Sequence, residues 1–586
     1  MITSRFYVII YLMKSLIDAA MKREKCDLVI KGAKVFNVFT GEIEEGEIAV
    51  KNGKIVGIGS GYDAQEVYNA NGAYALPSFI DAHIHVESSM LSPEEFALLS
   101  VKHGTGVIIA DPHEIVNVCG IAGAEYMKEA FSHILYRGVN PLEVCLQLPS
   151  CVPASPFETS GAVLNGKETE QEIGRDLFYG LGEFMNYPAV VGADEEALSK
   201  IEAALSQGKI VDGHAPALSG DALNSYAAAG IKTDHECVNA EDCREKLKRG
   251  LYVQLRNGSS AHNLEENAKA MTAYNFRRSI LCSDDRNAYD LKNHGEIDDA
   301  LKRLVRMGIP APWAIACTTL NTAECYGLKD KGALAPSYDA DIALVEDLKD
   351  FRVLGVFKRG VLVAEGDKTL FHAERYSSKE VKSTVKIKEV TADDFRLDLS
   401  GKVRVMRVKP NGIMTEEEVL NVSSQKGDVL LPKGVCKLAV IERHFASGNM
   451  GKCLLSGYGL KGGALGISVS HDSHNLVVVG DDNTAMARVA ALLKEAGGGM
   501  AVVNGKFERA FALDIAGLMS SKPYEEVILE TEEITAHARR MGIKEGIEPF
   551  MSLVFLSLAV IPKLRLTDKG LVDVDKFEIT TSQIKE

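Results

Sequence analysis

The chain has 586 residues, of which 46% are hydrophobic and 25% are charged. A single hydrophobic core does not grow to that size, so we expect an ordinary folded protein with two or three structural units. The formal net charge of -15 argues against nucleic acid or an anionic membrane as the main partner, because both attract concentrated lysine and arginine. We therefore expect a small molecule as the ligand.

The first residues carry the one candidate targeting segment, FYVIIYLM at positions 6–13. It is too short to span a bilayer, and no small-residue cleavage site follows it. We expect residues 1–25 to be a helical or frayed extension. The eleven cysteines include no C-x-x-C pair. Scattered cysteines of this kind indicate buried thiols in a reducing compartment, which predicts a cytoplasmic location.

Two separate stretches have the texture of short β-strands joined by glycine turns. Residues 26–75 contain DLVIKGAKVFN and GEIAVKNGKIVGIG, in which apolar positions alternate and N-G dipeptides mark turns. A similar pattern returns in residues 329–380. We expect both flanks to pair into one small β-sandwich domain, although a long insert separates them.

The insert, residues 76–328, alternates short apolar runs with helical stretches. Runs such as GVIIADPH, LEVCLQLPS and SILCSDD end in polar residues, and amphipathic stretches such as AEDCREKLKRG lie between them. This alternation is typical of βα units. Roughly eight such runs predict an α/β fold with a (β/α)₈ TIM-like barrel. After a Lys/Glu/Thr-rich linker, residues 381–586 are predicted to form an additional C-terminal α/β domain.

The segment SFIDAHIHVESSM places His83 and His85 two positions apart at the end of an apolar run. Both side chains of such a pair point to one face of a strand, as two metal ligands require, although a lone H-x-H is weak by itself. Four more predicted strand ends carry metal-compatible groups, namely Glu183, His214, His235 and Asp284.

Taken singly, each of these groups has an ordinary alternative role, such as capping a helix or bonding a loop. In a barrel, however, all six side chains would meet at one face. Six imidazole and carboxylate ligands are too many for one tetrahedral metal ion. They suit a pair of ions, with Glu183 placed to bridge them.

The segment FIDAHIH, followed by the later histidines and aspartate, resembles the amidohydrolase superfamily. More narrowly, DAHIHVESSMLSPEEFA, HGTGVIIADPHEIVNVCG, GEFMN, SHDSHNLVVVGDDNTAM and GGGMAVVNGK resemble the adenine deaminases of the bacterial and archaeal type. The resemblance covers nearly the whole chain from about Cys26, including a C-terminal domain that most amidohydrolases lack. One departure is Pro77-Ser78, where the superfamily usually has Pro-Gly.

The resemblance implies hydrolytic deamination of adenine to hypoxanthine and ammonia, a reaction of purine salvage, by hydroxide generated at a metal centre. It implies two divalent ions, with manganese as the expected metal and iron or zinc as alternatives. A homo-oligomer is also expected. Glu183 and Asp284 would be the catalytic residues, with Asp284 as proton shuttle and Asp285 as the competing assignment. The implied metal ligands are His83, His85, Glu183, His214, His235 and Asp284.

A purine presents ring nitrogens and an N–H to its pocket, so it needs carboxylate, imidazole or similar partners. The candidates directly follow the ligand pair or belong to the DPHE motif; they are Glu87, Ser88, Ser89, Asp111, His113 and Glu114. For Asp111 and His113, a turn stabilised by Asp-Pro is an equally weighted alternative. Three residues of the last domain, His471, Asp472 and His474, are candidates for a further metal or substrate contact. The alternative is that they belong to a solvated loop.

Two other functions fit part of the pattern. Another amidohydrolase reaction, on a cyclic amide or other heterocycle, would use the same metals and carboxylate, and fold analogy cannot separate the two. A non-catalytic barrel scaffold would be expected to lose ligands, yet all six positions are filled. The single-zinc deaminase design is excluded, because the H-x-E at residues 372–374 has no C-x-x-C to accompany it.

Overall fold

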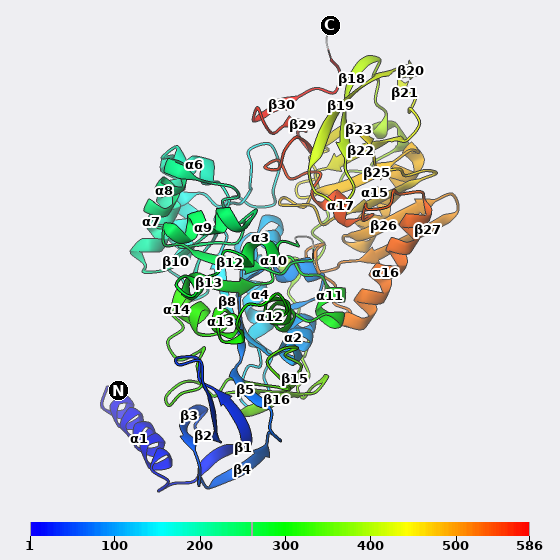
Figure 1. Ribbon diagram of the computed structural model, residues 1–586. Helices are drawn as coiled ribbons and strands as arrows, with labels where there is room; N and C mark the ends of the chain where they lie inside the picture. Colours follow the sequence, from blue (N-terminus) through cyan, green and yellow to red (C-terminus); the bar gives the residue numbers. More distant parts are fainter. Residues whose placement is uncertain (1, 260–261, 585–586) are drawn as a thin grey trace.

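The computed structural model describes residues 2–259 and 262–584. Figure 1 shows three parts along one long axis, with a β-sheet at the bottom, parallel strands and helices in the middle, and a second α/β unit at the upper right. The N-terminal helix α1 (Ile2–Ala20) lies at the bottom and packs on this sheet through Ala19. None of the helices in the described residues has the length and apolarity that crossing a membrane requires.

The bottom sheet combines strands from both flanks of the middle part. Strands β5 and β14 are antiparallel neighbours, with Leu76 opposite Ala343. The chain therefore leaves this mixed sheet at β5 and returns to it at β14. Its order is β17-β16-β15-β14-β5-β1-β2-β3, with β4 on β1. The bounds are β1 Cys26–Phe36, β2 Ile43–Lys51, β3 Lys54–Gly59, β4 Ala64–Asn69, β5 Tyr74–Pro77, β14 Ile342–Val345, β15 Val353–Lys358, β16 Val361–Glu365 and β17 Lys368–Thr369.

The middle part contains parallel strands in two sheets, ordered β10-β9-β8-β7-β6 and β11-β12-β13. The sheets adjoin at both ends, because β10 lies beside β11 and Ile84, the last residue of β6, pairs with Asp284 just after β13. These strands are buried almost throughout, which is why they read as continuous apolar runs in the sequence. The bounds are β6 Phe79–Ile84, β7 Thr105–Ala110, β8 Glu143–Leu148, β9 Gly180–Phe184, β10 Ile210–Gly213, β11 Thr233–Asp234, β12 Tyr252–Arg256 and β13 Ser279–Cys282.

Helices alternate with these strands and cover them. Helix α12 buries Ile297, Leu301 and Leu304 on one side and exposes charged residues on the other, the spacing of an amphipathic helix. Asn239 caps α9 by accepting two backbone N–H bonds at its start. The bounds are α2 Pro93–Ser100, α3 His113–Cys119, α4 Ile121–Ser132, α5 Gly166–Ile173, α6 Tyr187–Val191, α7 Glu195–Ser206, α8 Gly220–Ala228, α9 Ala240–Lys248, α10 Leu264–Ala268, α11 Ala288–Asn293, α12 Ile297–Arg306, α13 Ala311–Cys317 and α14 Leu320–Tyr326.

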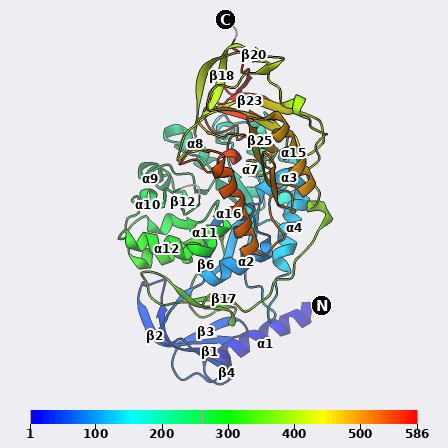
Figure 2. The ribbon, with the colours of Figure 1, turned by 90° about the vertical axis from the view of Figure 1, so that its right-hand side faces the viewer.

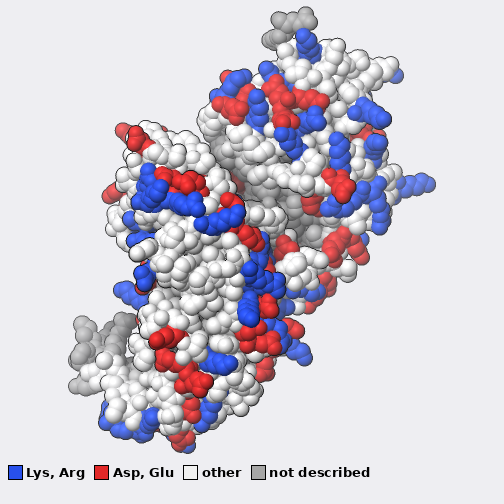
Figure 3. Space-filling model, in the orientation of Figure 1, with Lys and Arg blue, Asp and Glu red and all other residues white. Residues whose placement is uncertain are grey.

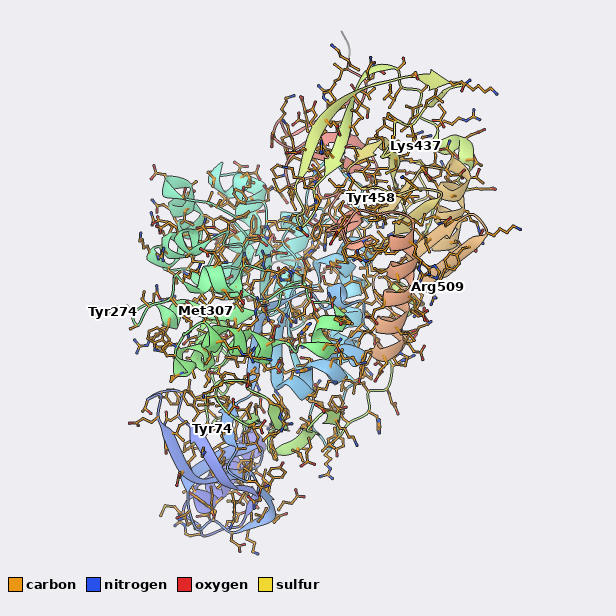
Figure 4. The ribbon with its side chains drawn as sticks, turned by 45° about the vertical axis from the view of Figure 1, so that its right-hand side comes forward. Tyr74, Tyr274, Met307, Lys437, Tyr458 and Arg509 are labelled. Carbon is orange, nitrogen blue, oxygen red and sulfur yellow. The ribbon has the colours of Figure 1, made fainter. Side chains whose placement is uncertain are left out.

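The upper unit is built on a mixed sheet in the order β19-β18-β23-β22-β25-β24-β26-β27. Helix α15 packs on this sheet, and α16 reaches down to α11 of the middle part, as the turned view in Figure 2 shows. In Figure 4, Lys437 and Tyr458 lie within this unit, whereas Tyr274 projects from the edge of the middle part. The bounds are β18 Gly401–Val408, β19 Thr415–Val422, β20 Ser424–Gln425, β21 Asp428–Val429, β22 Val435–Ile441, β23 Met450–Ser456, β24 Ala464–Ile467, β25 Leu476–Gly480, α15 Asn483–Ala496, β26 Gly499–Asn504, β27 Phe507–Ala512, α16 Tyr524–Arg540, α17 Met551–Val554, β28 Leu564–Thr567, β29 Gly570–Asp573 and β30 Glu578–Thr580.

These elements confirm the α/β class expected from the sequence. The exact domain boundaries, at residues 25, 75, 328 and 380, stay predictions. One buried hydrophobic cluster extends through the bottom sheet, the middle part and the upper unit, and smaller clusters lie within the bottom sheet and the upper unit. Phe36, Leu146 and Leu465 are examples from each. The parts therefore support one another through packing.

A buried ionic cluster joins the bottom sheet to the parallel strands. The Lys358 Nζ donates to Asp341 Oδ2 at 2.8 Å and to the carbonyl of Gly106 at 2.9 Å. Lys331 Nζ donates to the same carboxylate oxygen at 3.1 Å. Burial alone would raise the pKa of Asp341, but the two lysines lower it well below its usual value. Asp341 is thus a charged carboxylate that pairs with two lysines between the bottom sheet and the parallel strands.

We expect Asp341→Ala to destabilise the protein by about 3–5 kcal/mol, because Lys358 is almost fully buried and loses its nearest carboxylate. Lys331 keeps Asp339 and Glu143 as partners. Urea unfolding at neutral pH measures this loss. The effect should shrink as the pH falls below about 4, since a carboxylate with a lowered folded pKa loses its contribution on protonation. Asp350→Ala is the matched control, because its pair with Arg306 is exposed. Equal urea midpoints for the two variants would contradict the assignment.

Candidate metal centre

His83 and His85 lie at the end of β6 and face the same cluster. Their Nε2 atoms are 3.1 Å apart, and both rings are buried. The His85 Nδ1 is 3.0 Å from the backbone oxygen of Asp111. A carbonyl only accepts, so His85 Nδ1 carries a proton and donates to it, and Nε2 faces the cluster.

Glu183, near the end of β9, lies between two groups of imidazoles. Its Oε2 is 2.7 Å from His214 Nδ1 and 3.0 Å from His235 Nε2. Its Oε1 is 3.5 Å from His85 Nε2 and 3.4 Å from His113 Nδ1. Burial would raise the pKa of Glu183, but His214 and His235 lower it well below its usual value. One carboxylate thus presents a different oxygen to each side of the cluster.

Asp284 follows β13 and completes the cluster. Its Oδ1 is 3.3 Å from His85 Nε2 and 3.7 Å from His83 Nε2. Its Oδ2 accepts a hydrogen bond from Arg256 Nη1 at 2.7 Å. Burial would raise the pKa of Asp284, but the Arg256 guanidinium lowers it well below its usual value. The backbone of Asp284 has a φ of 58°, a left-handed conformation that non-glycine residues adopt mostly at turns and functional sites.

These donor atoms fit divalent metal ions. His83, His85 and Asp284 form one group whose donor atoms lie within 4.8 Å of one another, and His83, Glu183 and His235 form another. Burial and the neighbouring His235 lower the pKa of His83 well below its usual value, which keeps its ring neutral. The carboxylates raise the pKa of His85, His214 and His235 above its usual value, despite their burial. Buried imidazoles and charged carboxylates together are the ligand set of transition-metal ions. A cation between facing lone pairs would also remove their repulsion.

A cavity of about 480 Å³ is lined by Asp285, the residue after Asp284, and by Ser88, three residues after His85. Its walls come from both the middle part and the upper unit, with Ser88 and Asp285 on one side and Ile413, Glu548 and Phe555 on the other. Figure 3 shows the surface hollowed between these two parts. The lining combines apolar surface with a few polar groups, as small-molecule sites do.

The candidate substrate residues after His85 have different surroundings. Ser88 lines the cavity and donates to Asp285 Oδ1 at 2.5 Å and to Glu114 Oε1 at 3.0 Å. Glu87 is turned inward, where its Oε1 accepts from the backbone N–H of Ile115 at 3.2 Å. Ser89 donates to the carbonyl of Val86 and thus closes its own turn. Of this trio, Ser88 has the surroundings of a substrate contact.

The residues of the DPHE motif also differ from one another in their contacts. Asp111 Oδ2 accepts from the backbone N–H of Glu183 at 3.0 Å, so Asp111 orients that residue. Burial raises the pKa of Asp111 to about 8, and the nearby Glu183 charge adds to the effect. His113 touches the cluster through Glu183, while Glu114 faces Ser88 and the upper unit. The motif therefore supplies one supporting residue and two residues at the edge of the cluster.

Arg256 was absent from the sequence-based candidates. It stands at the end of β12 and pairs with both Asp284 and Glu236. The strand-end argument that singled out Asp284 applies equally to the R of YVQLR, so the sequence did hold this signal. The approach of Asp472 to His113 and of His471 to Glu114 is a second contact whose location the sequence left open.

The chain matches two family models, the amidohydrolase family over residues 74–363 and the adenine deaminase C-terminal domain over residues 412–578. It is 43% identical over 572 residues to adenine deaminase 2 of Desulfotalea psychrophila, covering 97% of this chain and 98% of the relative. It is 42% identical over 577 residues to adenine deaminase of Clostridium acetobutylicum, covering 97% and 100%. A solved dihydropyrimidinase from Brevibacillus agri aligns with 59% of this chain and 96% of its own at 18% identity and a TM-score of 0.42.

Parallel strands with buried histidine and carboxylate groups at their ends define a metal-dependent hydrolase, and the chain belongs to the amidohydrolase family. Relatives at this identity extend over nearly its whole length and include the C-terminal unit. Within the family, the chain is one of the adenine deaminases.

Proposed function

We propose that the chain converts adenine and water into hypoxanthine and ammonia, with two divalent ions held by the residues at the strand ends. The observation that carries this proposal is the position of Glu183, whose two oxygens face His85 and His113 on one side and His214 and His235 on the other. Membership of the adenine deaminases supplies the substrate.

The ligands of one ion would be His83, His85 and Asp284, those of the other His214 and His235, and Glu183 would bridge the two. When bound, divalent ions supply a Lewis acid that makes water a usable nucleophile near neutral pH. Manganese is the proposed ion, and iron and zinc accept the same imidazole and carboxylate ligands. The low pKa of Asp284 supports its role as a ligand, because it keeps the carboxylate ionised.

Asp284 is the proposed proton shuttle. Its Oδ1 faces the cluster while Arg256 holds Oδ2, so one oxygen is fixed and the other is available. It would accept a proton from the attacking water and deliver it toward the ring nitrogen or the departing amine. The C6–N bond breaks as ammonia leaves, and the new C6–O bond remains in hypoxanthine.

Ser88 is the proposed purine contact, since it lines the cavity. Glu114 accepts the hydrogen bond of Ser88 and His113 contacts Glu183, so both would hold the residues around the substrate. Glu87, Ser89 and Asp111 would support the surrounding backbone. We further propose that the parallel strands close into a (β/α)₈ barrel, which the contacts of β10 with β11 and of Ile84 with Asp284 support. A cytoplasmic homo-oligomer is the proposed form of the protein, and the eleven free cysteines fit a reducing compartment.

A purine panel assayed with metal-depleted and manganese-restored protein tests the proposal. Adenine should release one ammonia per hypoxanthine formed, the depleted protein should be inactive, and manganese should restore turnover. Hydantoin and dihydropyrimidine belong in the same panel, because other amidohydrolase reactions use the same residues. Turnover of either compound without ammonia release from adenine would replace the proposed substrate.

A further inference from the structure

A buried polar loop of the upper unit reaches the edge of the metal cluster. The loop Ser470–Asn475 joins β24 to β25, and His471, Asp472 and His474 in it are at most 7% exposed. Polar connections between strands usually lie at the surface in contact with water. This loop instead faces the start of α3, where His113 and Glu114 lie.

The side chains of the two parts face one another across short gaps. His471 Nδ1 is 3.8 Å from Glu114 Oε1, and His113 Nε2 is 3.8 Å from Asp472 Oδ1. His471 Nδ1 and Asp472 Oδ1 are 3.7 Å apart. Such distances are too long for hydrogen bonds. They suit ligands of one shared cation, because two donors that each lie about 2.0–2.2 Å from an ion are themselves roughly 3–4 Å apart.

Several atoms here lack a hydrogen-bond partner among the described residues, although they are buried. They include Glu114 Oε2, Asp472 Oδ2 and His474 Nε2. An unpaired buried polar atom is costly, so an occupant that contacts these groups would stabilise them. His474 Nδ1 accepts from the backbone N–H of Ser470 at 3.1 Å. The neutral ring therefore carries its proton on Nε2, which faces Glu114 Oε2 at 3.9 Å, so His474 presents an N–H and not a lone pair to this group.

The remaining donors form a compact set. One donor atom from each of His113, Glu114 and His471 lies within 4.8 Å of the other two, and Asp472 adds a second carboxylate beside them. Two imidazoles and two carboxylates favour manganese, iron or zinc over calcium or magnesium, which prefer oxygen ligands alone. His113 also faces Glu183, so this group adjoins the catalytic cluster.

We propose that His113, Glu114, His471 and Asp472 bind a third divalent transition-metal ion, distinct from the two ions at Glu183. Residues of the middle part and of the upper unit would each supply two ligands. The ion would thereby tie the upper unit to the start of α3. It would also fix Glu114, which accepts the hydrogen bond of Ser88 at the cavity.

Metal content and an anomalous difference map at the manganese edge test this proposal on full-length protein grown with manganese. After dialysis, the wild-type chain should hold three ions, and the map should show a third peak between His113, Glu114 and His471. His471→Ala should hold two ions. His103→Ala is the matched control and should keep three, since its half-buried ring pairs with Asp298 and belongs to none of the metal-compatible groups among the described residues.

Two ions in the wild-type chain with no third peak would overturn the proposal, as would three ions in His471→Ala. The wild-type map decides the question even if His471→Ala does not fold. Adenine turnover in the same preparation reports the proposed function separately. An active wild-type chain with two ions would contradict only the third site, whereas three ions without adenine turnover would contradict only the deaminase assignment.

Discussion

Asp284→Asn is expected to lower kcat for adenine by about 10³-fold, a loss typical of removing a general acid–base group. Asparagine keeps the shape of the side chain and can still accept the hydrogen bond of Arg256, so the fold should survive. It cannot take a proton from water. Steady-state kinetics by the change in ultraviolet absorbance measures the loss, and circular dichroism checks the fold.

Asp285→Asn separates the two neighbouring aspartates. Asp285 Oδ1 accepts from Ser88 Oγ at 2.5 Å, and no contact joins it to His83 or His85 among the described residues. Its replacement should therefore weaken substrate binding and raise KM more than it lowers kcat. A greater loss of kcat in Asp285→Asn than in Asp284→Asn would reverse the assignment of the proton shuttle.

Glu183→Gln is expected to remove metal and activity together. Glutamine keeps one oxygen but loses the charge that His214 and His235 face, and its NH₂ group would be directed at a cation or an imidazole. Supporting residues around a metal typically contribute 10–100-fold in affinity, so losing a direct ligand should cost at least about 100-fold. Inductively coupled plasma mass spectrometry of the dialysed variant measures the bound metal.

Glu195→Gln is the control for that variant, because Glu195 lies exposed in the first turn of α7. It should keep its metal and its turnover. If Glu183→Gln retained two ions per chain at wild-type activity, the central role given to this carboxylate would be wrong.

The sequence could predict which strands carry the cluster, because the pattern involved is local. His83 and His85 two positions apart must share a face of a strand, and strand ends of a parallel sheet lie at one edge. The structure brings their rings together with Glu183 and Asp284. Their role as ligands stays a prediction until metal is measured.

What the sequence could not predict depends on contacts between distant segments. The order of residues says nothing about whether Asp111 points into a cavity or back at the N–H of Glu183, since both positions are compatible with a strand end. The arrival of His471 beside Glu114 depends on how the upper unit docks on α3. Such docking follows from side-chain packing over a large surface, which no periodicity encodes.

The pairing of β5 with β14 also bears on the order of events during protein synthesis. The bottom sheet cannot be completed when its first strands leave the ribosome, because β14 begins only at Ile342. At typical synthesis rates of about 5–20 residues per second, β14 would be made on the order of tens of seconds after β5. The edge of β5 would be unpaired during that time. An unpaired strand edge invites association with other chains, so nascent chains of this protein should depend on chaperones more than chains whose strands pair in sequence.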